Sequence, residues 1–136
     1  MSVAQNLSYS IVQIAHNFGA VAVVGGSLSA VMLRGLETRK KLAWLVLAGW
    51  GLQAISGATF GAVSFYFYHQ FPDISGVAWI ALIVKTVCVA IGFLLLATLI
   101  LMSSNQKVGI SNSVWLASSA LAITALSSAA ILRWFS

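Results

Sequence analysis

Several polar side chains lie inside otherwise apolar stretches of this sequence, and their types can bind a ligand. Gln13, His16 and Asn17 are spaced at i, i+3 and i+4, which places them on one face of a helix. Gln53 lies in the next apolar stretch, and Lys85 is the only charged residue well inside the third. A charged side chain at the centre of a bilayer costs about 3 kcal/mol on insertion scales, so it usually has a partner or a task. These five residues are candidate binding residues.

The two histidines are the candidates for binding a metal or a cofactor. Neutral imidazole is a good ligand for haem iron or copper. His16 could be one axial ligand of haem b, with His69, at the end of the second apolar stretch, as the other. A five-coordinate haem, or Lys85 beside a haem propionate or a quinone-like oxygen, is equally open. Copper is less favoured, because the chain has three scattered methionines and no HxxxH or CxxC motif.

Structural roles are the alternative for the same residues. His16 could simply form a hydrogen bond to a neighbouring helix, and Lys85 could extend along its aliphatic stem toward the membrane surface. His69 would then be an interfacial residue in contact with water. The residue types leave both interpretations open.

The chain lacks the groups that hydrolysis or phosphoryl transfer requires. Its two acidic residues, Glu37 and Asp73, lie in polar breaks that the predicted topology puts on opposite sides of the membrane. A hydrolase, a kinase and a carboxylate-driven proton pump are therefore excluded, and the chain is not expected to be an enzyme on its own. The single cysteine, Cys88, allows neither an internal disulfide nor a cysteine-based metal site.

The composition indicates a lipid environment. Of the 136 residues, 60% are hydrophobic and 7% are charged, whereas soluble proteins carry roughly 25% charged residues. The net charge of +5 does not indicate nucleic-acid binding, because four of the basic residues share one short segment, where positive charge normally sets membrane orientation. These four are Arg34, Arg39, Lys40 and Lys41.

Four long apolar runs predict an all-α integral membrane protein, a four-helix bundle forming one transmembrane domain over residues 1–136. Each run exceeds the roughly 20 residues that a helix needs to cross the hydrocarbon core. Helices are expected because every backbone polar group must be satisfied within the segment. The predicted spans are 9–33, 42–68, 77–103 and 113–134.

The charges in the breaks predict the orientation of the bundle. The first and third breaks, residues 34–41 and 104–112, carry five Lys or Arg residues, and the second, 69–76, carries none. The positive-inside rule places the first and third breaks in the cytoplasm, with both termini and the second break outside. The localisation this predicts is a bacterial cytoplasmic membrane.

Small residues predict where the helices meet, since close approach in lipid requires them. Ala22, Gly26 and Ala30 recur at four-residue spacing in the first span, and Gly57 and Gly61 form a GxxxG pair in the second. Both sets are expected to pack against neighbouring helices.

The predicted depths of His16 and Lys85 agree. At 1.5 Å per residue, His16 lies about 10 Å and Lys85 about 12 Å from the outer ends of their spans. Because the two spans enter from the same side, the two side chains are expected to line one outward-facing polar pocket.

The sequence resembles the CopD/HemJ-like group of small four-helix membrane proteins over about its first hundred residues. The resemblance rests on His16 followed by small residues, on the Ser56–Gly57 pair and on the Trp-x-x-Leu-x-x-Lys pattern from Trp79 to Lys85. The group includes copper-resistance D-type proteins and haem-binding protoporphyrinogen oxidases. The resemblance implies the bundle, the polar pair of His16 and Lys85, and haem or copper as the ligand.

These features predict a membrane protein that binds a redox ligand, haem b first, near its outer face. The alternative is a cofactor-free accessory subunit of a larger membrane complex, whose small residues serve assembly with other subunits. A copper permease is a third, weaker alternative.

Overall fold

The chain forms four long helices. The computed structural model describes residues 2–70, 73–103 and 110–135, and this part of the chain contains no strand. Each helix is long and apolar enough to cross a membrane. The predicted all-α membrane bundle is therefore confirmed, and the lipid bilayer is its environment. The helices are α1 (Val3–Met32), α2 (Leu36–Tyr68), α3 (Gly76–Ser103) and α4 (Asn112–Phe135).

The helix boundaries extend beyond the predicted spans at two places. Helix α1 begins six residues before the predicted start, with Ser2 as a cap whose hydroxyl accepts a hydrogen bond from the Gln5 amide. Helix α2 begins at Leu36. Residues 36–41, which belong to the predicted first polar break, therefore form the first turns of this helix. Glu37 lies in that first turn, where the helix dipole favours an acid, and its carboxylate is 3.6 Å from the Lys40 ammonium.

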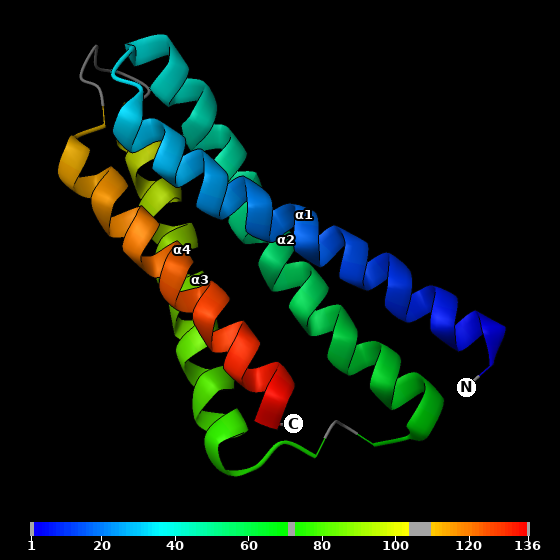
Figure 1. Ribbon diagram of the computed structural model, residues 1–136. Coiled ribbons are helices and arrows are strands. Elements are labelled where there is room, and N and C mark those ends of the chain that lie inside the picture. Colours follow the sequence, from blue (N-terminus) through cyan, green and yellow to red (C-terminus); the bar gives the residue numbers. More distant parts are fainter. Residues whose placement is uncertain (1, 71–72, 104–109, 136) are drawn as a thin grey trace.

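The helices form two antiparallel hairpins, α1–α2 and α3–α4, arranged as an open V (Figure 1). The hairpins meet at the end where α1 passes into α2, and they diverge toward the end that holds both termini. Helix α1 also contacts α4, and α2 contacts α3, whereas no described Cα atoms of the diagonal pairs α1–α3 and α2–α4 approach within 8 Å. Both termini and the α2–α3 connection thus share one end of the molecule, as predicted.

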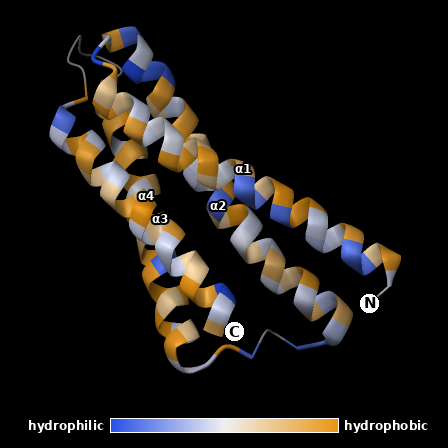
Figure 2. Cartoon of the chain, viewed as in Figure 1, coloured by the Kyte–Doolittle hydropathy of each residue, from blue (hydrophilic) through white to orange (hydrophobic). Residues whose placement is uncertain are grey.

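The packed core lies in the half of the bundle near the α1–α2 connection. Trp50, Leu96 and Trp115 are almost completely buried there, and the hydroxyls of Ser27 on α1 and Ser118 on α4 form a buried hydrogen bond of 2.8 Å. Figure 2 shows hydrophobic residues along all four helices and hydrophilic residues at the start of α2. The other half of the molecule is open.

Glycines permit the closest approach, between α1 and α2. A Cβ atom on Gly49 would lie 3.1 Å from the carbonyl oxygen of Gly19, and one on Gly26 would lie 2.6 Å from Val46. Gly26 and Ala30, predicted to pack, are buried as expected. Gly57 behaves differently, because nothing lies within 4 Å of a Cβ atom built on it. The prediction that Gly57 packs against a neighbouring helix is wrong.

Arg39 ties the hairpins together where they meet. Its Nε donates to the carbonyl oxygens of Ala30 and Leu33, which end α1, and Nη1 and Nη2 donate to the Ile110 carbonyl and the Asn112 side chain at the start of α4. The guanidinium thereby satisfies carbonyl groups that a helix leaves unpaired at its C-terminus. One residue of the basic segment is thus structural.

Replacing Arg39 by glutamine is expected to lower the stability of the bundle by about 1–3 kcal/mol, because hydrogen bonds from a charged donor are lost and their carbonyl acceptors stay partly buried. Lys41→Gln is the matched control, since it makes the same charge change two residues away at an exposed side chain. The measurement is thermal unfolding in detergent, followed by circular dichroism. Equal unfolding midpoints for the two variants would show that the hydrogen bonds of Arg39 contribute nothing to the stability of the bundle.

Candidate functional site

A cleft of about 1480 Å³ opens between the two hairpins. All four helices line it, and most of its wall is apolar. Small residues form much of the surface: Ala54, Gly57, Ala58 and Gly61 on α2, and Ala122, Ala125, Ala129 and Ala130 on α4. The GxxxG pair therefore faces the cleft, and the wide wall of small side chains leaves room for a ligand.

His16 lies in this cleft and is held by α2. Its Nδ1 is 2.7 Å from the hydroxyl oxygen of Ser56, and the Gln53 amide donates to the His16 backbone carbonyl. Phe60 packs its ring at an angle of 74° to the imidazole, with the ring centroids 5.7 Å apart. The side chain of His16 is 9% exposed. Two contacts from α2, those of Ser56 and Phe60, thus orient the imidazole ring, and Gln53 holds the backbone of His16.

The hydrogen bonds of Ser56 assign the tautomer of His16. The Ser56 hydroxyl has one hydrogen, and it donates to the Leu52 carbonyl one turn earlier on α2. The Ser56 oxygen must then accept from Nδ1–H of His16. The lone pair of the imidazole is consequently on Nε2, on the side of the ring that faces α3.

Lys85 reaches that lone pair from α3. Its Nζ is 2.9 Å from His16 Nε2, so the ammonium donates to the imidazole across the cleft. The side chain is half-buried and points inward to His16 instead of extending to the membrane surface. The structure thus brings together the two residues whose predicted depths agree, on helices whose backbones do not touch.

The cleft is cationic. Among the described residues that line it, Lys85 and Arg133 are basic and none is acidic. Glu37 lies near the opposite end of α2, and Asp73 is an exposed residue of the α2–α3 connection outside the lining. The ammonium of Lys85 therefore has a neutral imidazole as its partner in place of a carboxylate.

Gln13, three residues before His16, and Asn17, directly after it, also line the cleft. They are exposed, and the Gln13 amide donates to the Asn17 side-chain oxygen over 2.7 Å. The prediction that Gln13, His16 and Asn17 share one helix face is correct. Gln13 and Asn17 form a hydrogen bond with each other, whereas the ring of His16 bonds to Ser56 and Lys85. Gln53, the remaining predicted polar residue, acts on the His16 backbone.

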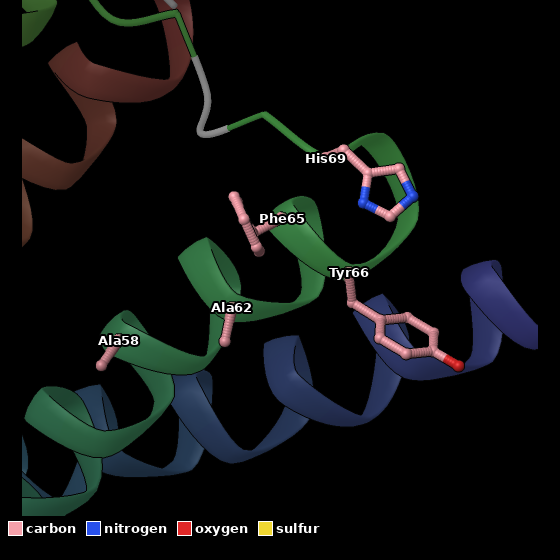
Figure 3. Close-up of a pocket in the computed structure, with 5 residues that line it drawn as sticks. All are labelled: Ala58, Ala62, Phe65, Tyr66 and His69. Atoms are coloured by element: carbon pink, nitrogen blue, oxygen red, sulfur yellow. The ribbon is translucent and has the colours of Figure 1, made fainter.

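His69 lies elsewhere. It caps the C-terminus of α2 in the left-handed conformation, with φ 53°, and its ring contacts Phe65. Figure 3 shows it beside a separate recess formed by α2 and its cap, lined by Ala58, Ala62, Phe65, Tyr66 and His69. His69 lies thirteen residues after Ser56, the partner of His16. This separation along the helix is about 20 Å at 1.5 Å per residue. This arrangement does not bring the two imidazoles to one iron.

Sequence reasoning placed Ser56 in the second span but did not identify its role. The matching level appears only with the observed helix ends, because His16 lies thirteen residues from the start of α1 and Ser56 twelve from the end of α2. The available signal was that a buried imidazole needs a partner for its second nitrogen. Arg133, which also lines the cleft, is not among the predicted site residues.

Within the described ranges, no three His, Cys, Asp or Glu side chains gather in a way that could hold a metal ion. A free ion would thus find one imidazole. Comparison of the chain with protein-family models, curated proteins and solved structures gives no match. The chemistry of the cleft must be argued from its own residues.

Proposed function

We propose that the cleft binds haem b, with His16 as an axial ligand through Nε2 and with Lys85 paired to a propionate. One observation carries this proposal: a lone pair on a fixed imidazole is directed into a large apolar cleft. Ligating histidines typically donate their other ring N–H to a protein acceptor, which sets the tautomer, and Ser56 is such an acceptor here.

The donor set suits a haem better than a bare ion. A porphyrin supplies four of the iron's ligands itself, so one imidazole is sufficient from the protein. A copper ion would need several protein ligands, and His16 is the one His, Cys, Asp or Glu among the described residues that line the cleft. The apolar walls suit the macrocycle, and the cationic lining suits its propionates. Haem b, when bound, would supply a one-electron redox centre.

The proposal includes the setting. The basic start of α2 favours the cytoplasm for the closed end of the V, which directs the open cleft to the outer face of a bacterial cytoplasmic membrane. The resemblance to the CopD/HemJ-like group, based on His16, Ser56–Gly57 and Trp79–Lys85, is in accord with this assignment.

The test is a titration of the detergent-purified protein with haem b. We expect a saturable Soret shift with a stoichiometry of one, and a reduced-minus-oxidised spectrum with a distinct α-band. A spectrum that stays identical to that of haem b in the same detergent would refute the proposal.

The open cleft also favours a second candidate, an accessory subunit that receives a helix of another membrane protein. The observation behind it is Gly57, which lines the cleft in open space although GxxxG pairs commonly mediate helix contacts. In that case Gly57→Leu would abolish co-purification of the other subunits, and the titration of the isolated chain would show only the spectrum of haem b in detergent.

A further inference from the structure

Lys85 covers the one atom of His16 that can bind a ligand. Nδ1 carries the hydrogen that Ser56 accepts, so only Nε2 can coordinate, and the Lys85 ammonium lies 2.9 Å from it. A ligand can reach Nε2 only after Lys85 moves away.

Moving Lys85 away is costly unless the ammonium gains a new partner. Among the described residues that line the cleft, the other basic residue is Arg133 on α4, and none is a carboxylate. A cation in the membrane interior that loses its acceptor is strongly disfavoured. A ligand that carries an acidic group removes this difficulty, because a carboxylate is a stronger acceptor for an ammonium than a neutral imidazole is.

We propose that Lys85 makes coordination by His16 conditional on an acidic group in the ligand, so that Lys85 is a specificity-determining residue. This inference rests on the proposed haem function. The ammonium exchanges the imidazole for the ligand's carboxylate, and the exchange frees the Nε2 lone pair. Neutral ligands of the same shape must instead displace the ammonium without replacing its acceptor.

The test compares two probes, haem b and haem b dimethyl ester, whose propionates are neutral. Wild-type protein should bind the ester more weakly than haem b by about tenfold or more, which corresponds to about 1.4 kcal/mol per tenfold. Lys85→Met, which keeps an unbranched apolar side chain, should bind the ester more tightly than the wild type does. Thr98→Val is the control, because Thr98 is an exposed residue of α3 outside the lining of the cleft and its hydroxyl donates within its own helix. The preference of this variant for haem b should equal that of the wild type.

The increase in ester affinity is the decisive result. A lysine that only attracts propionates would lower haem b affinity on replacement and leave ester affinity unchanged, and that outcome would overturn the inference while preserving the haem proposal. If neither probe binds any variant, both proposals fail together.

A measurement without haem tests directly whether Lys85 donates to Nε2 of His16. The chain has two histidines, so His69→Gln protein with nitrogen-labelled histidine reports on His16 alone. We expect a proton on Nδ1 and none on Nε2, with the Nε2 signal shifted by Lys85→Met and unchanged by Thr98→Val. A proton on Nε2 in protein that retains Lys85 would contradict the proposed hydrogen bond from the Lys85 ammonium to Nε2.

Discussion

Replacement of His16 by glycine is expected to abolish the haem b spectrum, with haem affinity falling by more than the roughly 10–100-fold that is typical when only the hydrogen-bond partner of a ligating histidine is lost. Ser56→Ala removes that partner, and its loss should fall within that lower range, because the imidazole remains but its orientation and tautomer are no longer fixed. The measurement is the Soret titration of each purified variant. The order of the losses distinguishes a ligand from its positioning residue.

Two controls separate ligation from folding. His69→Ala should bind haem b as the wild type does, since His69 lies beyond the C-terminus of α2, outside the lining of the cleft and beside another recess. Added imidazole should restore the spectrum of His16→Gly, because the glycine leaves a cavity of the shape of the missing ring. A His16→Gly protein that is helical and monodisperse but still binds haem b without imidazole would show that the ligand lies elsewhere.

The four crossings were predictable because lipid imposes a length and a backbone rule that hydropathy reveals directly. The helix ends were less predictable. Residues 36–41 are polar and helical at once, and hydropathy cannot distinguish a polar helical turn from a loop. Helix propensity and the acidic residue Glu37 in the first turn favour a helix for this segment.

The approximate depth of the site along the helices was predictable from the sequence, but the helix faces that line the cleft were not. His16 lies thirteen residues from the start of α1 and Lys85 nine from the start of α3, which is about 20 Å and about 14 Å of helix. They still meet, because the long side chain of Lys85 crosses the space between the helices. Which face each helix turns to the cleft depends on packing of the whole bundle. Small residues such as Gly57 suit a helix contact and an open wall equally, so the sequence alone could not decide between them.

Gly92 is where packing should tolerate change least. A Cβ atom there would lie 2.4 Å from Cε2 and 2.6 Å from Cζ2 of Trp50, and the Trp50 side chain is 1% exposed. The indole is rigid and enclosed, so α3 must shift away from α2 to accept even one methyl group. Gly92→Ala is therefore expected to destabilise the bundle by about 1–3 kcal/mol, the usual cost of overpacking a core.

Gly57→Ala is the matched control for Gly92→Ala. It makes the same change on a neighbouring helix with nothing within 4 Å of the new atom, so it should be neutral or stabilising by at most about 1 kcal/mol from helix propensity. Equilibrium unfolding in mixed detergent measures both. Trp50→Leu removes the ring atoms that clash, so the double variant with Gly92→Ala should lose less than the sum of the single changes. Additive losses would show that the contact between α2 and α3 is not the cause.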